Sequence, residues 1–339
     1  MKRIWIPVVL LAAIIGGSIW ALWPRSQQGL VLYSAVDYSG DVAAAFTKKT
    51  GIKVTVIELT TGALLAKISA EGHRPAWALA WFDGDLAAAA LDHAGLVSRH
   101  IVPQLPWTDE GRSLVPADGS YTPTGLTLAG AYTYRPTVMS NPPQTWTGLV
   151  NPALHGAIGM NNPSISGPMY PMLAGMLAQG GGWPKGQAFV VKLKGNGLHV
   201  YAKNKATLAA LREGDIKMAI TQSSAAWYLA AKDPTLRVRI PKPAFALPSV
   251  LVVAAGIPAK TRVAAERFIR FAMNHDIQKL RIGQGEGDSY YWPLTTDAPQ
   301  PKAGMPALDT LVIKHLNPGR WGPIEPQVNQ WFSQAIIGQ

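Results

Sequence analysis

Three loops with hydroxyl side chains each stand directly before a predicted helix. They are Thr60-Thr61-Gly62, Ser164-Ile165-Ser166-Gly167 and Thr221-Gln222-Ser223-Ser224. The first turn of a helix has free N–H groups and a partial positive charge, which suit a phosphate, phosphonate or carboxylate group. Each loop also fits plain helix capping, the commonest use of Ser and Thr at this position. The repetition favours an anion-binding role for at least one of them.

Aromatic and charged side chains mark two further positions. Trp81-Phe82-Asp83 ends a predicted strand, where a ring and a carboxylate suit an amine. Core packing is the alternative role for Trp81. Lys203-Asn204-Lys205 precedes another predicted helix and either supplies charge to an anion or forms a solvated loop.

Other chemistries find little support in the sequence. There is no cysteine, and no two of the seven histidines have a metal-ligand spacing such as i, i+4. Nucleophile elbows, Walker loops and dinucleotide fingerprints are missing. Residues 283–287 are rich in glycine but follow a predicted helix rather than a strand. We therefore expect no enzyme, no metal and no cofactor; a hydrolase has only the Ser-rich loops in its favour.

Composition indicates a folded protein with a basic surface. The chain has 339 residues, of which 48% are hydrophobic and 15% charged, and its mean hydropathy is +0.09. This excludes a disordered chain and leaves room for two domains. Residues 30–339 carry 28 basic and 20 acidic side chains, a net charge of +8. The excess favours anionic partners, but no dense Lys/Arg run indicates nucleic acid.

Residues 1–29 read as an export signal or membrane anchor with a linker. Lys2 and Arg3 precede an apolar run, residues 4–23, about as long as a bilayer-spanning helix. Gly16-Gly17-Ser18 is the one passable cleavage site, and it lies inside that run. Retention as an anchor and cleavage both stay open.

The body of the chain alternates strand and helix patterns, which predicts an α/β fold with a mainly parallel sheet. In the first part we expect strands at 30–35, 53–58, 77–82 and 126–134, with helices at 41–49, 60–72 and 86–93. A Pro-rich loop near Pro142 then leads into a second unit. Its predicted strands are 157–160, 198–201 and 216–220, and its helices 168–177, 205–212 and 223–232; strand 246–255 and helix 262–273 follow.

Five segments of the chain carry a resemblance to a known family. They are LVLYSAVDYSGDVAAAFTKKTGIKVTVIELTTGALLAKISAEG (30–72), RPAWALAWFDGDLAAAALDHAGLV (74–97), PPQTWTGLVNPALHGAIGMNNPSISGPMYPMLAGML (142–177), VLVVAAGIPAKTRVAAERFIRFAMN (250–274) and Tyr290-Tyr291-Trp292-Pro293. In this order and spacing, over about residues 30–298, they resemble periplasmic solute-binding proteins of ABC importers. The branch concerned includes binders of ferric ion, polyamines, thiamine, and phosphonates or sugar phosphates.

The resemblance implies a two-lobed α/β fold of the type 2, Venus-flytrap kind. Each lobe has a central sheet, and two strands form the hinge. Residues 30–134 and 246–339 would form lobe 1, and residues 135–245 lobe 2. The ligand would lie in the cleft between the lobes, outside the carboxyl ends of the strands.

The resemblance also adds residues to the predicted cleft. It places Ser34 and Tyr38 at the cleft mouth, as a donor and as a cover for an organic group; an Asx-type turn with an exposed Tyr38 is the alternative. Tyr290 falls where the family commonly has a Tyr-Pro turn. The predicted ligand-binding residues are Ser34, Tyr38, Thr60, Thr61, Gly62, Trp81, Asp83, Ser164, Ser166, Gly167, Asn204, Thr221, Gln222, Ser223 and Tyr290.

Two departures from the family pattern bear on the ligand. Ala78 stands where the family usually has an acidic residue. The ferric-ion branch has adjacent tyrosines where residues 221–228 of this chain offer hydroxyls, an amide and only one phenol, Tyr228. Because ferric ion needs phenolates and carboxylates, iron is disfavoured.

The sequence thus predicts a binding component of an ABC transporter. It would capture a small organic anion, a phosphonate or phosphate ester with or without an amine, and deliver it to a permease in the inner membrane. A ferric-ion or polyamine carrier and an anchored ligand sensor are the alternatives. We expect a monomer without a nucleic-acid partner, periplasmic and either free or anchored by residues 4–23.

Overall fold

The structure is a computed structural model and describes residues 29–284 and 286–338. The predicted signal or anchor, residues 4–23, lies outside these ranges. Within them, no helix has the length and apolar character needed to cross a membrane.

The first lobe is built on a six-stranded sheet of mixed direction. Its order is β11-β10-β3-β1-β2, and β4 pairs with the other edge of β10. Strands β1, β2 and β3 run parallel, whereas β10 is antiparallel to β3 and β4. The strands are β1 (Leu30–Ser34), β2 (Val54–Glu58), β3 (Leu79–Asp83), β4 (Thr122–Leu128), β10 (Ala244–Val253) and β11 (Ile313–Lys314).

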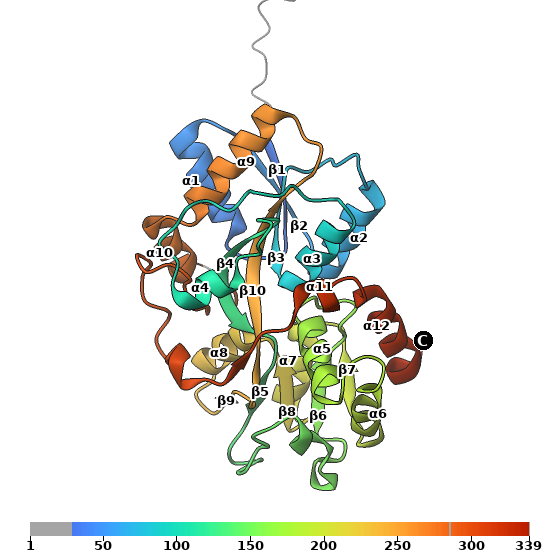
Figure 1. Ribbon diagram of the computed structural model, residues 1–339. Coiled ribbons are helices and arrows are strands. Elements are labelled where there is room, and N and C mark those ends of the chain that lie inside the picture. The colour runs from blue at the N-terminus through green and yellow to red at the C-terminus, as the bar shows by residue number, and fades with distance from the viewer. Residues whose placement is uncertain (1–28, 285, 339) are drawn as a thin grey trace, which may run out of the picture.

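Helices cover both faces of this sheet, with α1 and α9 on one side and α2 and α3 on the other (Figure 1). Alternation along β1 explains the two cores, because Leu32 joins the core under α1 and α9 while Tyr33 joins the core under α2 and α3. The helices are α1 (Ser39–Thr50), α2 (Thr61–Glu71), α3 (Asp85–His93), α4 (Asp109–Leu114), α9 (Ala259–Ala272) and α10 (His275–Gln284).

The second lobe has a five-stranded sheet of order β7-β6-β8-β5-β9. Its strands are β5 (Ala131–Tyr134), β6 (Ile158–Asn161), β7 (His199–Tyr201), β8 (Met218–Thr221) and β9 (Arg237–Arg239). Its helices are α5 (Met169–Gln179), α6 (Gln187–Gly195), α7 (Asn204–Glu213) and α8 (Ser223–Lys232). Helix α5 is apolar on every side because it is enclosed in the largest core of the molecule. The expectation of two sheets in an α/β fold is confirmed.

The first crossing between the lobes falls inside the single strand predicted at 126–134. That segment is two strands, β4 in the first sheet and β5 in the second. The crossing therefore lies at 129–130, before rather than after Ala131–Tyr134. A Cβ on Gly130 would stand 2.4 Å from the Trp146 ring, so the chain passes here only with glycine. The return crossing joins β9 to β10.

The C-terminal segment departs from the boundaries expected for lobe 1. After β11 come α11 (Pro318–Trp321), α12 (Glu325–Phe332) and a π-helical turn (Ser333–Ile337). Trp321, Val328 and Phe332 belong to the core that α5 occupies in the second lobe. The segment therefore makes a third connection between the lobes, with α11 also packed on α3 (Figure 1).

Candidate functional site

A cavity of about 240 Å³ lies between the two lobes. Its first-lobe lining consists of Ala35, Thr60, Thr61, Asp83 and Asp288, and its second-lobe lining of residues 165–168 and 203–205 with Gln222. The parallel strands β1, β2 and β3 all end at this edge of the sheet, which is why loops far apart in sequence meet here. Seven of the predicted binding residues come together: Thr60, Thr61, Asp83, Ser166, Gly167, Asn204 and Gln222.

Three carboxyl groups gather on the first-lobe side. Asp37 and Asp288 each accept a hydrogen bond from the other's backbone N–H, at 3.2 and 2.9 Å. Across the cleft, Gln222 Nε2 lies 3.5 Å from Asp83 Oδ2 and 3.4 Å from Asp288 Oδ1. The same Nε2 donates to Ser224 Oγ at 2.6 Å, which leaves one hydrogen for the two acids across the cleft.

Burial favours the protonated forms of Asp83 and Asp288. It raises the pKa of Asp83 to about 6, and the nearby charge of Asp37 acts in the same direction. Burial, followed by the charges of Asp37 and Asp83, holds the pKa of Asp288 well above its usual range. A cation entering the cleft would stabilise the ionised form of both groups.

The second-lobe side is organised by one fully buried amide, Asn161 at the end of β6. Its Nδ2 donates to Ser166 Oγ at 3.1 Å and to Asn204 Oδ1 at 2.6 Å. Its Oδ1 accepts from the Thr207 hydroxyl at 2.5 Å. Asn161 therefore fixes the two loops that carry Ser166 and the lysines, Lys203 and Lys205, into the cavity wall.

The lobes touch at two glycines beside the cavity. A Cβ on Gly167 would lie 2.4 Å from Thr61 Cγ2, and one on Gly62 would lie 2.8 Å from the Ser164 carbonyl oxygen. Thr60 caps α2 by accepting a hydrogen bond from Ala63 N at 3.4 Å. This is the helix-capping role that was the alternative to anion binding for these loops. Gly62 and Gly167 thus allow the two lobes to approach each other closely.

Three predicted residues lie in the core of the first lobe instead of the cavity lining. Trp81 is fully buried and donates from Nε1 to Thr124 Oγ1 at 3.0 Å. Tyr38 is 2% exposed, so it is neither a cleft cover nor a surface residue. Ser34 Oγ accepts from Val36 N within its own turn. The polar atoms of Trp81 and Ser34 are bonded inside the fold, and the buried Tyr38 hydroxyl accepts from Arg281 Nη2, so all three serve the lobe interior.

The remaining predicted residues surround the cavity without lining it. Ser223 is buried, and its Oγ accepts a hydrogen bond from Leu128 N at 3.0 Å, next to the first crossing. The Thr221 hydroxyl donates to the Gln222 carbonyl. Ser164 and Gly62 line a neighbouring cavity of about 400 Å³. Tyr290 packs edge-on against Tyr228, with ring centroids 6.5 Å apart.

Sequence reasoning missed Asp288 and Asn161 as site residues. Asp288 follows the glycine-rich residues 283–287, a segment that suggests at most a phosphate loop. It reaches the cleft through its hydrogen bonds with Asp37. Asn161 ends a predicted strand one residue beyond its expected boundary. A polar residue at the carboxyl end of a strand was the available signal for Asn161.

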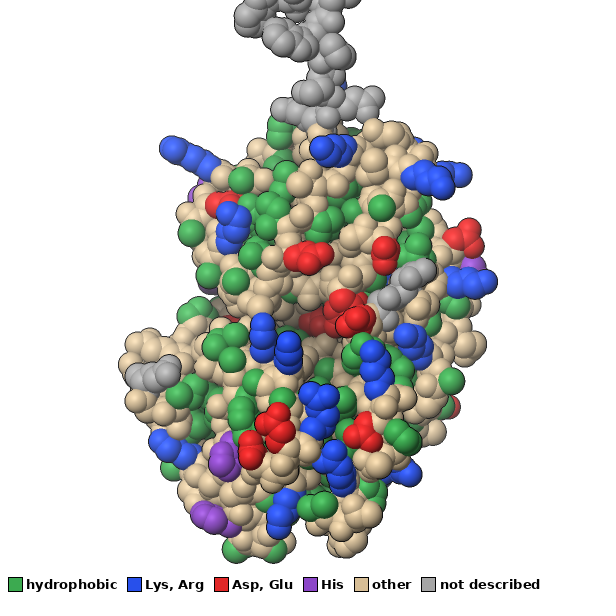
Figure 2. Space-filling model, turned by 180° about the vertical axis from the view of Figure 1, so that it is seen from behind, with side chains coloured by type: hydrophobic (Ala, Val, Ile, Leu, Met, Phe, Trp, Pro, Cys, Tyr) green, Lys and Arg blue, Asp and Glu red, His purple; other side chains and the backbone are tan. Residues whose placement is uncertain are grey.

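Side chains of opposite charge face each other where the two lobes meet. Figure 2 shows acidic side chains gathered between the two halves, with Lys and Arg side chains on the half below. The cavity lining repeats this pattern, with Asp83 and Asp288 from one lobe and Lys203 and Lys205 from the other. In the part of the chain that the structure describes, no three His, Asp or Glu side chains are grouped to hold a metal ion.

Comparison with known proteins places this geometry in context. A family model described as bacterial extracellular solute-binding protein matches residues 41–308. No curated protein matches the chain in sequence. Among solved structures, iron-bound HitA from Pseudomonas aeruginosa is 19% identical with a TM-score of 0.74, and the match covers 89% of this chain and 98% of that one.

Two further structures share the architecture. AfuA from Actinobacillus pleuropneumoniae, with fructose-6-phosphate bound, is 18% identical with a TM-score of 0.78 over 91% of this chain and 98% of that chain. A periplasmic thiamin binding protein is 17% identical with a TM-score of 0.72 over 91% and 96%. At these identities the likeness shows the fold, and the suspected type 2 fold is confirmed.

Proposed function

Because the chain belongs to the family of bacterial extracellular solute-binding proteins, we propose that it captures a small zwitterion and delivers it to an ABC permease. The solute carries a phosphonate or phosphate group at one end and an amine at the other. This refines the organic anion expected from the sequence by making the amine a required part of the ligand.

The opposed charges of the cavity walls carry this proposal. Lys203 and Lys205 precede and begin α7, and Ser166 adds a hydroxyl donor held by Asn161. Together they suit the anionic end of a solute. Asp83 and Asp288 line the opposite wall and suit the amine. A cavity of about 240 Å³ suits a solute smaller than a drug-sized molecule.

Lobe closure follows from the same arrangement. A zwitterion that spans the walls attracts both lobes at once, and Gln222 already joins them through Asp83 and Asp288. Binding energy therefore favours the closed state, which a permease distinguishes from the open one.

Isothermal titration calorimetry tests the assignment with three probes: 2-aminoethylphosphonate, ethylphosphonate and putrescine. We expect the first to bind tightest, because only it satisfies both walls. Asp288→Asn and Lys203→Met should each weaken it about tenfold or more, the loss expected for a charge-assisted hydrogen bond. Asp276→Asn and Lys279→Met, exposed on α10, are the matched controls. Equal affinities for 2-aminoethylphosphonate and ethylphosphonate would overturn the role of the amine.

A polyamine carrier is the second candidate, supported by the three carboxyl groups of Asp37, Asp83 and Asp288. It predicts that putrescine binds tighter than 2-aminoethylphosphonate and that Lys203→Met leaves this affinity unchanged. Ferric ion has less support, because the Tyr228 hydroxyl accepts a hydrogen bond from Lys232 Nζ at 2.6 Å.

We place this function in the periplasm, in keeping with the family. Whether residues 4–23 are cleaved or anchor the protein stays a prediction from the sequence. N-terminal sequencing of the membrane and soluble fractions decides between the two.

A further inference from the structure

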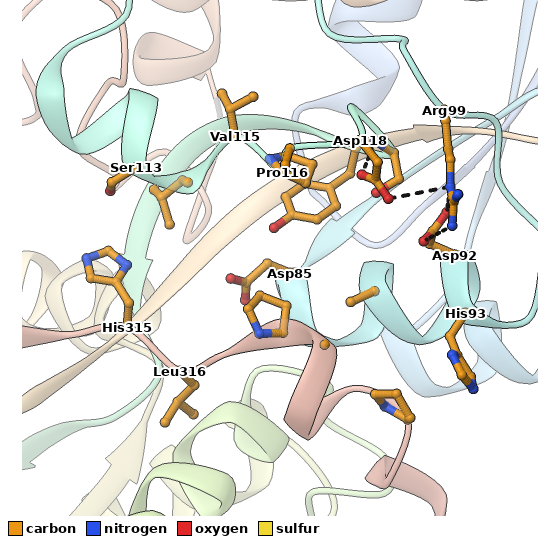
Figure 3. Close-up of a pocket in the computed structure, with 18 residues that line it drawn as sticks. Asp85, Asp92, His93, Arg99, Ser113, Val115, Pro116, Asp118, His315 and Leu316 are labelled. Atoms are coloured by element: carbon orange, nitrogen blue, oxygen red, sulfur yellow. Dashed lines mark hydrogen bonds and ion pairs between the residues drawn. The ribbon is translucent and has the colours of Figure 1, made fainter.

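A second, larger cavity lies away from the cleft. It measures about 570 Å³ and is enclosed by α3, the segment 113–121 and the C-terminal segment around His315 and Leu316 (Figure 3). Its lining shares no residue with that of the interlobe cavity. One wall belongs to the first lobe, while the C-terminal segment continues into the core of the second. The cavity is therefore independent of the proposed zwitterion site.

Three polar side chains of its lining, those of Asp85, Ser120 and Tyr121, are more than nine-tenths buried, and two of them concern the proposal. Asp85 is 8% exposed and Tyr121 is 4% exposed. In the part of the chain that the structure describes, no side chain donates a hydrogen bond to the Asp85 carboxylate, which lies at the start of α3 near its own and the Leu86 backbone N–H groups. Within the described residues the Tyr121 hydroxyl has no hydrogen-bond partner. In Figure 3 the Asp85 carboxylate lies amid the labelled side chains and turns toward the side of His315.

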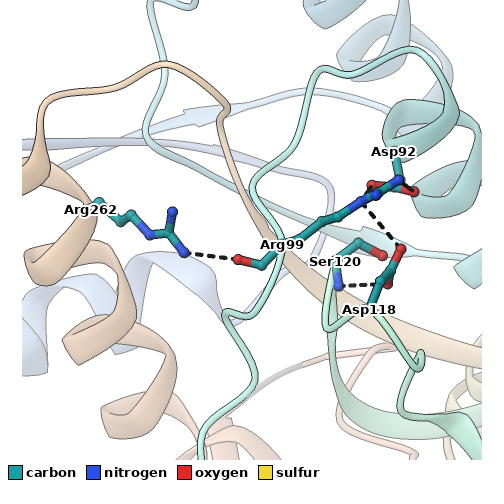
Figure 4. A network of polar contacts seen from close by, with 5 residues as sticks. All are labelled: Asp92, Arg99, Asp118, Ser120 and Arg262. Atoms are coloured by element: carbon teal, nitrogen blue, oxygen red, sulfur yellow. Dashed lines mark hydrogen bonds and ion pairs between the residues drawn. The ribbon is translucent and has the colours of Figure 1, made fainter.

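The basic side chains of the lining are engaged elsewhere or exposed. Arg99 binds Asp92 through Nε and Nη2 at 2.8 and 2.9 Å, and its Nε lies 3.4 Å from Asp118 (Figure 4). His315 Nε2 lies 3.1 Å from Glu110 Oε1. In residues 29–284 and 286–338, no basic side chain forms an ion pair with Asp85. Asp85 thus has no ion-pair partner in these residues, and among side chains only the nearby charge of His315 favours its ionised form.

The rest of the wall is mixed, with Asp92, Ser113 and Asp118 among its polar residues and one apolar part. Leu114, Pro116, Leu316 and Pro318 supply the apolar part. A buried carboxylate and a phenol hydroxyl in a cavity with an apolar part suit a protonated amine attached to an apolar body. We propose that this cavity is a second ligand site, which takes an amphipathic organic amine through Asp85 and Tyr121.

Calorimetry with 2-phenylethylamine and its neutral analogue 2-phenylethanol tests the proposal. The titration is run at pH 8, because burial raises the pKa of Asp85 to about 7 and the carboxyl is mostly ionised there. We expect the amine to bind about tenfold tighter than the alcohol, since only the amine pairs with the carboxylate. Asp85→Asn should remove this preference, and Tyr121→Phe should weaken amine binding several-fold. The exposed Asp276→Asn is the control.

Three outcomes would overturn the proposal: no binding of the amine at millimolar concentration, equal binding of amine and alcohol, or an unchanged affinity in Asp85→Asn. The amine could instead bind in the interlobe cavity, and Asp288→Asn tests this. Loss of 2-phenylethylamine binding in Asp288→Asn but not in Asp85→Asn would place the amine there. The comparison of the two probes on the wild-type protein holds even if Asp85→Asn does not fold. If 2-phenylethylamine does not bind, the results expected with 2-aminoethylphosphonate do not change, so the two proposals are tested independently.

Discussion

The guanidinium carbon of Arg281 lies 4.8 Å from the centre of the Tyr38 ring, and its Nη2 donates a 3.1 Å hydrogen bond to the Tyr38 hydroxyl. The rings of Trp81 and Tyr291 stand at 5.1 and 4.7 Å from the same carbon. Arg281 is fully buried, and its Nη2 also donates to the Thr124 carbonyl at 2.9 Å. The cation is thus held by three aromatic faces behind the carboxyl cluster of the cleft.

This cage predicts a large effect of a conservative change. Arg281→Lys keeps the charge but loses the planar group that stacks on three rings and bonds two acceptors. We expect it to lower the free energy of unfolding by about 2–3 kcal/mol, measured by urea denaturation. Lys279→Met, exposed on the same helix, should change it by less than about 0.5 kcal/mol. An Arg281→Lys protein as stable as the wild type would show that the cage contributes little.

Two serines that look alike in the sequence should respond differently to alanine. Ser223→Ala removes the buried acceptor of Leu128 N and should lower stability by about 1–3 kcal/mol with little change in affinity. Ser166→Ala should weaken 2-aminoethylphosphonate binding by a similar free energy, and it should also lower the unfolding midpoint because the buried Asn161 Nδ2 loses an acceptor. Thermal unfolding and calorimetry on both variants distinguish the roles; a loss of affinity in Ser223→Ala but not in Ser166→Ala would refute the assignment.

Glycine at position 167 should be needed for closure. Gly167→Ala places a Cβ 2.4 Å from Thr61 Cγ2 and so keeps the lobes apart without touching either core. We expect solute affinity to fall about tenfold or more and the radius of gyration with solute to stay that of the open form, by small-angle X-ray scattering. Gly40→Ala, where a Cβ meets no atom within 4 Å, is the control. Unchanged affinity in Gly167→Ala would contradict this reading.

The buried Asp85 should make the free energy of unfolding depend on pH. Its pKa is raised from 3.8 to about 7 by burial, so the folded state binds the proton more tightly than the unfolded state. Stability therefore falls as pH rises from about 4 to 7. The full shift corresponds to about 4 kcal/mol, which solvent in the cavity reduces.

Asp85→Asn isolates this contribution. The variant keeps an acceptor at the start of α3, and we expect its stability to fall less between pH 4 and pH 8 than that of the wild type. Urea denaturation at several pH values measures the difference. Parallel pH curves for the two proteins would count against the raised pKa.

Solute binding in the cleft should depend on pH in the opposite sense. Burial raises the pKa of Asp83 to about 6, and an amine binds the ionised carboxylate. Affinity for 2-aminoethylphosphonate should therefore increase as pH rises through about 6, and Asp83→Asn should flatten this profile. A profile that stays steep in Asp83→Asn would assign the titration to another group.

Local patterns predicted much of the fold. Helix α8 has the bounds expected from the sequence, and the strands β1, β2 and β3 were predicted within two residues. The alternating pattern at 126–134 did not reveal that the chain changes sheets at Gly130, because both strands are apolar and β-prone. Helices α6 and α10 were missed, since each buries only a narrow face and has a weak apolar period.

The sequence by itself determined the order of strands and helices, the α/β class and the hydroxyl loops that begin helices, because these depend on neighbours along the chain. The two-lobed arrangement was implied by the resemblance to a known family. Tertiary structure decided which side chains line the cleft. Trp81 and Asp83 are two residues apart on β3, yet one donates to Thr124 in the core while the other meets Gln222 of the opposite lobe. Asp288 joins the site through contacts with Asp37 and Gln222, which are 251 and 66 residues away in the sequence. Such placement depends on long-range packing, which local pattern does not encode.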